Sequence, residues 1–267
     1  MHLVSANVNG IRAAARRGGV ERLARSGADV IALQEVRADD AQLREALVGT
    51  ELGGWHVAHP ASTAKGRAGV AVLSRAEPLA VRADLAEEFA GAGRWVEVDL
   101  PAEGGSRPVT VASAYVHTGQ AGTARQDEKE RFLGAIGERL RCWGAQGRWA
   151  VLTGDVNVAH TADDLKNWKG NRGKAGFLPS EQAHLDAWVG EHGFVDVTRA
   201  LHGAGPGPYT WWSWRGQAFD NDSGWRIDYQ FASRQLAPRA VRGAVGRAAA
   251  YEDRWSDHAA VSVTYDL

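Results

Sequence analysis

Short apolar runs of strand length recur along this 267-residue chain, and several of them meet a polar cluster at one end. These clusters are Asn7-Val8-Asn9 after Leu3-Val4, Gln34-Glu35 after 30–33, Gly154-Asp155-Val156-Asn157 after 150–152, and Asp257-His258 before 259–263. One Asp-His pair beside a strand is a weak signal. Its repetition at successive strand ends favours a sheet-rich fold that gathers carboxylates, carboxamides and a histidine in one place.

The pattern of apolar residues predicts a single domain over residues 1–267, since no Pro/Ser-rich linker or change of composition divides the chain. Strands are expected at 3–7, 30–34, 55–59, 69–73, 95–100, 109–115, 149–153, 209–212, 226–231 and 257–265, and helices at 13–26, 39–48, 125–143 and 179–192. Residues 101–106 are expected to form a hairpin connection. Many short strands with few helices favour packed sheets flanked by helices over a fully parallel wound sheet.

The composition indicates an intracellular protein. Hydrophobic residues make up 44% of the chain and charged residues 24%, as in ordinary globular proteins. Cys142 is the only cysteine, so no intramolecular disulfide can form. Cys142 is expected to be a packing residue. No apolar stretch approaches membrane-spanning length, and the first strand leaves no room for a signal peptide. We therefore expect a cytoplasmic monomer with no membrane partner.

The polar clusters have the composition of a metal-assisted site that cleaves phosphate esters. Residues two apart in an extended segment share a face, which pairs Asp155 with Asn157 and Asn7 with Asn9. If the strand ends converge, one cleft is lined by Asn7, Glu35, Asp155, Asn157, Asp228, Asp257 and His258. Such oxygen ligands suit Mg²⁺, with Mn²⁺ as a substitute, whereas no second His or Cys at metal spacing favours zinc.

Each cluster taken alone also has a purely structural interpretation. Asn7 and Asn9 can cap turns, Glu35 can be ion-paired, Asp155 can form an Asx turn, and Asp228 can pair with a surface arginine such as Arg226. Independent structural explanations at every strand end are less economical than one shared site. The joint functional interpretation is therefore preferred.

Several strings resemble the exonuclease III family of abasic-site endonucleases, within the deoxyribonuclease I-like superfamily. They are Asn7-Val8-Asn9-Gly10-Ile11-Arg12, Leu33-Gln34-Glu35, Gly154-Asp155-Val156-Asn157, Trp225-Arg226-Ile227-Asp228-Tyr229 and Ser256-Asp257-His258. Their order and spacing agree along the whole chain. The resemblance implies an α/β four-layer sandwich, with two mixed β-sheets packed face to face and helices on both outer sides.

The resemblance also implies roles for the polar residues. Glu35 is expected to be the principal metal ligand, with Asn7, Asp155, Asn157 and Asp257 contributing around one or two ions. Asp155 is expected to align or deprotonate the attacking water. His258, oriented by Asp228, would donate to the scissile phosphate, and Tyr115 matches the family tyrosine near that phosphate.

Most residues implied to bind the substrate lie in loops and in tryptophan-containing segments. The segment 164–177 combines basic residues with glycines and asparagines, and it matches a DNA-binding loop of the family. The expected contacts are Asn9, Arg37, Thr118, Lys166, Asn167, Asn171, Arg172, Lys174, Trp211 and Trp225. Trp211 and Trp225 match positions that wall the pocket for an extruded abasic sugar. The chain departs from the family at His117-Thr118, where a proline followed by Asn or Gln is usual.

The expected function is Mg²⁺-dependent hydrolysis of duplex DNA 5′ to abasic sites, with 3′→5′ exonuclease and 3′-phosphate-clearing activities. The expected partner is duplex DNA with abasic sites or blocked 3′ ends, on the nucleoid of a bacterium. Two alternatives stay open: a phosphodiesterase or phosphatase of the same superfamily acting on RNA, inositol phosphates or lipids, and a nucleic-acid-binding regulator that has lost catalysis.

Overall fold

The computed structural model describes residues 1–60, 62, 66–101 and 107–267, and it contains two six-stranded mixed sheets. The first sheet has the order β11-β12-β1-β2-β4-β3. Its strands are β11 (Ala240–Gly246), β12 (Ala260–Tyr265), β1 (His2–Asn7), β2 (Val30–Gln34), β4 (Ala71–Ser74) and β3 (His56–Ala58). The second sheet has the order β5-β6-β7-β8-β10-β9. Its strands are β5 (Ala80–Arg82), β6 (Trp95–Leu100), β7 (Val109–Tyr115), β8 (Trp149–Asp155), β10 (Asp228–Ser233) and β9 (Phe194–Asp196).

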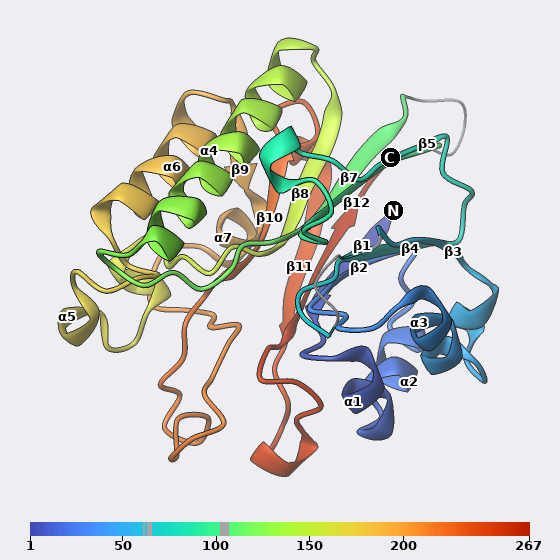
Figure 1. Ribbon diagram of the computed structural model, residues 1–267, viewed down its shortest axis with the longest axis horizontal. Coiled ribbons are helices and arrows are strands. Elements are labelled where there is room, and N and C mark those ends of the chain that lie inside the picture. Colours follow the sequence, from blue (N-terminus) through green and yellow to red (C-terminus); the bar gives the residue numbers. More distant parts are fainter. Residues whose placement is uncertain (61, 63–65, 102–106) are drawn as a thin grey trace.

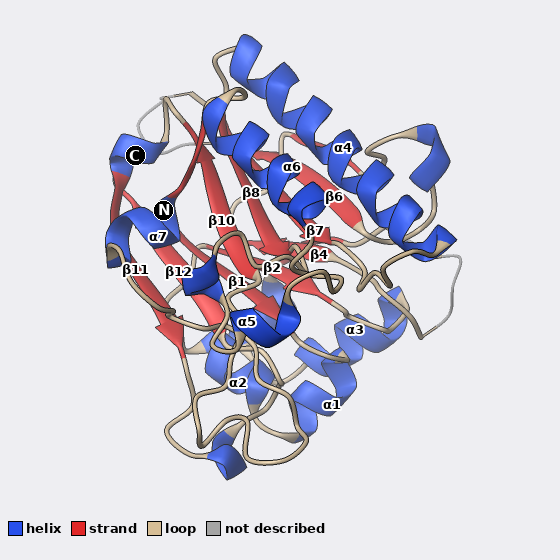
Figure 2. Cartoon of the chain, turned by 90° about the vertical axis from the view of Figure 1, so that its left-hand side faces the viewer, coloured by secondary structure: helices blue, strands red, loops and turns tan. Residues whose placement is uncertain are grey.

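Helices cover the outer face of each sheet, so the molecule has four layers (Figures 1 and 2). Helices α1 (Ile11–Arg16), α2 (Gly19–Ala24) and α3 (Asp40–Leu47) lie on the first sheet, and α4 (Ala124–Ala145) and α6 (Pro179–Gly190) lie on the second. The shorter α5 (Trp168–Asn171) and α7 (Val197–His202) lie in connections. This arrangement confirms the fold expected from the sequence. In the described part of the chain, no helix has the length and apolar character needed to cross a bilayer.

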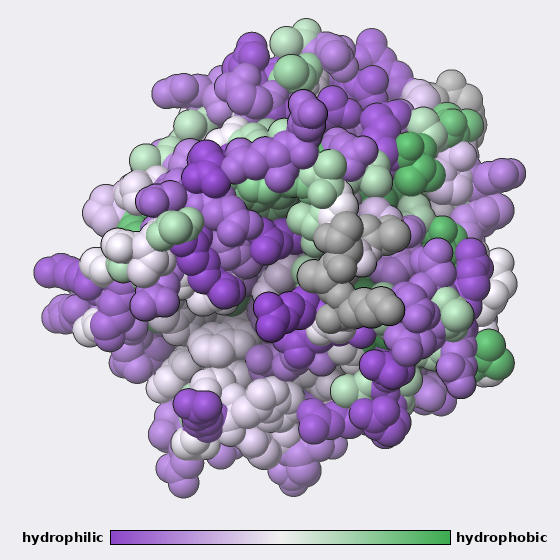
Figure 3. All heavy atoms as spheres, in the orientation of Figure 1, coloured by the Kyte–Doolittle hydropathy of each residue, from purple (hydrophilic) through white to green (hydrophobic). Residues whose placement is uncertain are grey.

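Three apolar layers hold the elements together. Leu3, Val98 and Val151 are part of a cluster between the two sheets. A second cluster packs α1–α3 on the first sheet, and a third, which includes Trp143 and Trp188, packs α4 and α6 on the second. Burying one such side chain stabilises the fold by roughly 1.5–3 kcal/mol. The polar faces of the helices remain outside, and the face in Figure 3 is mainly hydrophilic, with hydrophobic side chains only in small separate groups.

The prediction of one continuous helix at 13–26 is wrong. The segment forms two short helices that are separated at Gly18, which has a left-handed φ of 75°. A Cβ at the next residue, Gly19, would lie 2.6 Å from the Trp255 ring, so the chain breaks where that ring packs. The other predicted helices occur with shifts of their ends.

Three strands were missed, and one predicted strand is wrong. β5, β9 and β11 were not expected, and β11 lies at a sheet edge where most of its side chains are exposed and the apolar alternation is weak. The predicted strand at 209–212 is an irregular segment in which Trp211 makes isolated bridges to Trp225 and His258. β6 and β7 pair antiparallel, while residues 102–106 of the expected hairpin connection lie outside the described residues.

The strand pairing explains why the polar clusters converge. β1 and β2 are parallel, with Asn7 beside Gln34, and β7 and β8 are parallel, with Tyr115 beside Asp155. Parallel neighbours end at the same edge of a sheet. Because the two sheets pack face to face, the ends of both pairs come together from opposite layers.

Candidate active site

A pair of carboxylates held by one amide forms the centre of the site. Glu35 follows β2 in the first sheet and Asp155 ends β8 in the second. Asn7 donates through Nδ2 to Glu35 Oε1 at 2.9 Å and to Asp155 Oδ2 at 2.9 Å. Its Oδ1 accepts the Asn9 N–H at 3.0 Å. Asn7 therefore positions the two carboxylates through its amide N–H groups, and its oxygen keeps one acceptor position beyond the Asn9 bond.

The backbone turns sharply where the site residues leave their strands. Asn9, Glu35, Arg37 and Asn157 all have a left-handed backbone, with φ between 46° and 53°. This region costs a non-glycine residue about 1 kcal/mol or more, so the surrounding structure must hold it. The Glu35 carbonyl, for example, accepts the Gly10 N–H at 2.8 Å. The turns end the strands and direct polar side chains toward a common space.

Asp155 is almost fully buried, and its two oxygens accept several hydrogen bonds. Oδ1 accepts the backbone N–H of Asn157 at 2.9 Å, and Oδ2 accepts Asn157 Nδ2 at 3.1 Å in addition to the Asn7 amide. Burial raises the pKa of Asp155 well above its ordinary value, and the nearby carboxylates of Asp228 and Glu35 raise it further. A carboxylate with a raised pKa is a better proton acceptor than a solvated one.

His258 lies beside Asp155 and is anchored from behind. Its Nδ1 lies 2.9 Å from Asp228 Oδ2, while its Nε2 lies 3.8 Å from Asp155 Oδ2. The same Asp228 oxygen accepts Thr210 Oγ1 at 2.6 Å. Burial alone lowers the pKa of His258, but Asp228 and Asp155 outweigh it and raise this pKa to about 10. The imidazole is therefore protonated at neutral pH and presents an N–H at Nε2.

Tyr115, Thr118 and Asn157 complete this side of the site. Asn157 is held by Val116 O, which accepts its Nδ2 at 2.8 Å, and Thr118 Oγ1 lies 3.4 Å from its Oδ1. Burial raises the pKa of Tyr115, and Glu35 and Asp155 add to the effect, so its phenol stays protonated. These residues line one cavity with the carboxylates.

Asp257, which was expected near the metal, has both oxygens occupied within the protein. Oδ1 accepts Asn9 Nδ2 at 2.7 Å, and Oδ2 accepts Trp211 Nε1 at 3.2 Å. Asp257 lines the same cavity as Glu35 and Asp155, but it lies outside the closest cluster of possible ligand atoms. Its contacts orient Asn9 and Trp211 at the edge of the site.

The cavity has a volume of about 380 Å³ and combines a polar floor with an aromatic wall. Trp211 and Trp225 contact edge to face, with ring centroids 6.5 Å apart. Gly176 lies against Trp225, and a Cβ at this glycine would be 3.2 Å from the ring. The wall of the cavity is therefore tightly packed and has little room for larger side chains.

The basic side chains of the predicted DNA-binding loop lie outside the cavity, and only Ala175 and Gly176 at the end of the loop line it. Lys166, Asn167, Arg172 and Lys174 are exposed, and Asn171, which is half-buried, donates through Nδ2 to the Asn167 carbonyl at 2.9 Å. The loop carries α5, and its basic side chains are available to an anionic surface.

A buried ion network supports the base of this loop. Arg226 donates through Nε to Asp164 at 2.7 Å and through Nη1 to Asp196 at 2.6 Å, and Arg199 also pairs with Asp164. Arg226 is almost fully buried. The interpretation of Arg226 as a surface partner of Asp228 is therefore wrong, because its charge is matched by carboxylates that are distant along the chain.

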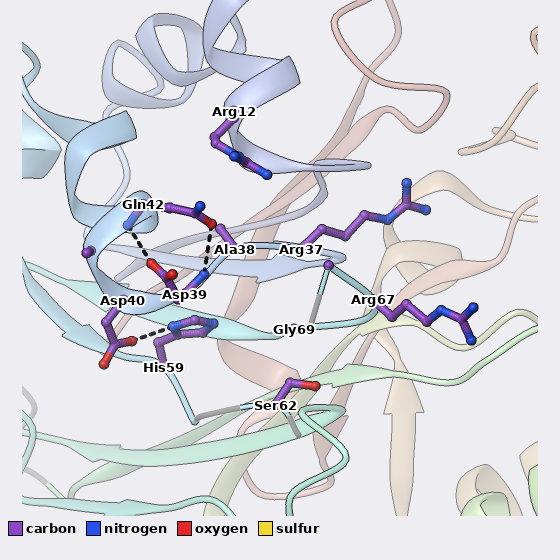
Figure 4. Close-up of a pocket in the computed structure, with 12 residues that line it drawn as sticks. Arg12, Arg37, Ala38, Asp39, Asp40, Gln42, His59, Ser62, Arg67 and Gly69 are labelled. Carbon is purple, nitrogen blue, oxygen red and sulfur yellow. Dashed lines mark hydrogen bonds and ion pairs between the residues drawn. The ribbon is translucent and has the colours of Figure 1, made fainter. Parts of the chain in front are cut away.

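A second cavity of about 750 Å³ adjoins the site through Arg37, whose side chain also pairs with Glu35 (Figure 4). Arg12 and Arg67 line it as well, and Figure 4 shows the guanidinium groups of Arg37 and Arg67 extending to the same side. Sequence reasoning did not assign a role to Arg67, and only the fold brings it near Arg12.

His117, at the departure from the family pattern, is neither solvated nor a phosphate contact. It is buried, with Nδ1 2.9 Å from Arg94 Nη1 and Nε2 3.1 Å from the Arg125 carbonyl. Burial lowers the pKa of His117, and Arg94 lowers it further. The histidine therefore packs the connection between β7 and α4.

The donors fit a divalent cation. Ligand atoms of Glu35, Asp155 and His258, all buried, lie within 4.8 Å of one another. The close carboxylates leave negative charge that Arg37 and His258 offset only in part, and oxygen donors of this kind suit Mg²⁺ or Mn²⁺. His258 is already engaged by Asp228 and carries a proton, so the carboxylates are the better ligands.

A four-layer sandwich whose strand ends bring together buried carboxylates and a histidine is typical of a class of hydrolases. The chain matches the endonuclease/exonuclease/phosphatase family over residues 4–258 and belongs to it. It is 35% identical over 238 residues to the exodeoxyribonuclease of Bacillus subtilis (strain 168), covering 88% of this chain and 89% of that protein.

Solved structures agree with this assignment. An AP endonuclease from Archaeoglobus fulgidus matches with a TM-score of 0.85 at 25% identity, and both chains are covered completely. The 3′ phosphatase NExo from Neisseria, bound to a product DNA hairpin, matches with a TM-score of 0.85 at 27% identity, again over the whole of both chains. The resemblance inferred from the motifs is confirmed at the level of the family.

Proposed function

We propose that this protein is a Mg²⁺-dependent DNA repair nuclease that hydrolyses the phosphodiester 5′ to abasic sites in duplex DNA. The observation that carries the proposal is the buried Glu35, Asp155 and His258 cluster at the floor of a cavity with an aromatic wall. The same site would serve 3′→5′ exonuclease and 3′-phosphate removal, since each reaction is hydrolysis of a phosphate ester.

Each polar side chain has a task in this proposal. Asp155 takes a proton from the attacking water, because its raised pKa and its hydrogen bonds from Asn7 and Asn157 prepare it as a base. His258 donates from Nε2 to the scissile phosphate, and Asp228 keeps the ring oriented. Tyr115 supplies a phenolic hydrogen bond. Glu35, with Asp155, would hold the cation, which supplies charge neutralisation for the phosphate and the leaving oxygen.

Abasic DNA is favoured by the shape and charge around the cavity. The wall of Trp211 and Trp225 can accept a deoxyribose without its base, and the close packing of Gly176 crowds a full nucleotide. Lys166, Arg172 and Lys174 on one side would bind backbone phosphates. Arg12 and Arg67 in the second cavity would contact phosphates on the other side.

The relatives support the same assignment. An exodeoxyribonuclease, an AP endonuclease and a DNA-bound 3′ phosphatase share this fold. A DNA substrate would place the protein on the nucleoid if the chain is bacterial, as the relatives from Bacillus subtilis and Neisseria are. RNA, inositol phosphates and lipids remain the alternative substrates, although the exposed basic loop favours a long polyanion.

The test is cleavage of an end-labelled duplex that carries one abasic-site analogue, in Mg²⁺ and in EDTA, with an undamaged duplex as control. Incision at the lesion only in Mg²⁺ is expected. Binding without incision in any metal would favour a silent regulator. Hydrolysis of RNA or phosphoinositides without incision of abasic DNA would overturn the proposal in favour of the alternative.

A further inference from the structure

A fully buried ion pair lies directly behind the active site. Lys129 of α4 and Glu181 of α6 are 0% exposed, and Lys129 Nζ lies 2.6 Å from Glu181 Oε1. Neither side chain reaches the cavity, and nothing in the reaction described above uses them. Breaking such a pair is costly, but replacing both members by apolar residues is often neutral or stabilising. The attraction between the two charges alone therefore does not explain why the pair is there.

Glu181 Oε1 also accepts Gln126 Nε2 at 2.9 Å, and the other hydrogen bonds of the pair go to loop backbone. Lys129 Nζ donates to the Asn157 carbonyl at 2.8 Å. Glu181 Oε2 accepts the N–H groups of Gly176 at 2.7 Å and Leu178 at 3.0 Å. The pair thus satisfies backbone groups of two loops, one that follows β8 and one that precedes α6.

Both loops contribute to the cavity. Asn157, beside Asp155, and Gly176, beside Trp225, line it from two sides. Ala159 N–H donates to the Gly176 carbonyl at 2.8 Å, which joins the loops directly. A Cβ at Gly176 would lie 3.3 Å from the Asn157 carbonyl oxygen, so the separation between these loops has little freedom.

We propose that Lys129 and Glu181 are positioning residues that hold the Gly176 wall at a fixed distance from Asn157 and so set the selectivity of the cavity for an extruded abasic sugar. The inference rests on the proposed function. Opposite charges suit this task because the ammonium attracts a carbonyl of one loop while the carboxylate attracts N–H groups of the other. An apolar pair of similar size would fill the space without making these bonds.

The experiment compares wild type with the double variant Lys129→Met/Glu181→Leu. Binding selectivity is measured in EDTA as the Kd for undamaged duplex divided by the Kd for a duplex with a tetrahydrofuran abasic analogue. The double variant leaves the Asn157 carbonyl and the Gly176 and Leu178 N–H groups without these partners, so it is expected to unfold at a lower temperature than the wild type. In its folded form it is expected to lose about tenfold in this ratio. The matched control, Arg141→Met/Glu138→Leu, removes an exposed ion pair of the same helix and should keep the wild-type ratio.

Wild-type incision of abasic DNA is measured first, because its absence would reject the proposed function itself. If the wild type incises but the double variant keeps its selectivity within about twofold, the positioning role is overturned. It is also overturned if the wild type incises without binding selectivity. If the double variant does not fold, Glu181→Gln is judged by the same ratio, since it removes the charge and keeps the size of the side chain.

Discussion

His258 Nδ1 lies 2.9 Å from Asp228 Oδ2, and this contact turns Nε2 toward Asp155. The other oxygen of Asp228, Oδ1, is buried and has no hydrogen-bond partner in the described part of the chain. Asp228 is therefore committed to the histidine and to Thr210. Two buried carboxylates on either side of one imidazole keep it protonated, as proton donation to a phosphate requires.

We expect Asp155→Asn and His258→Ala each to lower kcat by roughly 10²–10⁴-fold, the usual contribution of a general acid or base. Single-turnover incision of abasic DNA gives this value, and circular dichroism checks the fold. His202→Ala, at a histidine of α7 outside the cavity, serves as control. Turnover within a few-fold of wild type in either variant would remove that residue from the mechanism.

Metal binding should be visible without catalysis. Mg²⁺ in excess of its Kd is expected to raise the Tm of the wild type. At a concentration of a hundred times the Kd, binding adds about 2.7 kcal/mol to the free energy of unfolding. Glu35→Gln should lose most of this shift, whereas Glu45→Gln on α3 should keep it. Differential scanning fluorimetry in EDTA and in Mg²⁺ measures both. An undiminished shift in Glu35→Gln would place the ion elsewhere.

The aromatic wall should govern discrimination between damaged and intact DNA. Trp225→Ala and Trp211→Ala open the cavity, and we expect each to lower the preference for abasic over undamaged duplex by about tenfold or more. Competitive incision assays report this preference. Trp168→Ala changes a tryptophan of the basic loop that does not line the cavity, and it should leave the preference unchanged.

The basic loop should bind backbone phosphates and should not contact the abasic site. Replacing Lys166, Arg172 and Lys174 by Ala is expected to reduce the slope of log Kd against log salt by about 0.9 for each phosphate that the loop no longer neutralises. Affinity should fall equally for abasic and intact duplex. Titrations at several salt concentrations measure both quantities, and an unchanged slope would show that the loop does not bind DNA.

Asp164 should make the fold sensitive to acid. Burial alone raises the pKa of Asp164, but Arg226 and Arg199 outweigh it, so the net pKa is lowered. A lowered folded-state pKa gives stability that is complete above the ordinary value of 3.8 and is lost as pH falls through the folded value. At pH 7, Asp164→Asn should lower the free energy of unfolding by about 3 kcal/mol.

The difference between wild type and Asp164→Asn should therefore shrink as pH falls below 3.8. Urea denaturation from pH 7 to pH 3 measures it, with the exposed neighbour Asp163→Asn as control. A difference that stays constant over this range would mean that folding does not lower the pKa of Asp164.

Local patterns sufficed to find the elements that carry the chemistry. The apolar runs before Asn7, Glu35 and Asp155 are buried strands, and buried strands are the segments whose pattern is strongest. Edge strand β11 was missed because its exposed side chains leave no clear alternation. The helix break falls at the Gly18-Gly19 pair, a local breaker signal that the apolar pattern of residues 13–26 does not take into account.

The sequence by itself predicted the class of chemistry, because carboxylates, carboxamides and one histidine at strand ends are groups suited to a hard cation and a phosphate ester. The tertiary structure alone decided how these groups divide the work. Asn7 donates hydrogen bonds to two carboxylates, and the buried pair of Lys129 and Glu181 connects two loops. Arg226 is buried and forms ion pairs with Asp164 and Asp196. Each outcome depends on partners that are distant along the chain. The packing of the two sheets brings Glu35 and Asp155 to Asn7, while the packing of α4 against α6 joins Lys129 to Glu181.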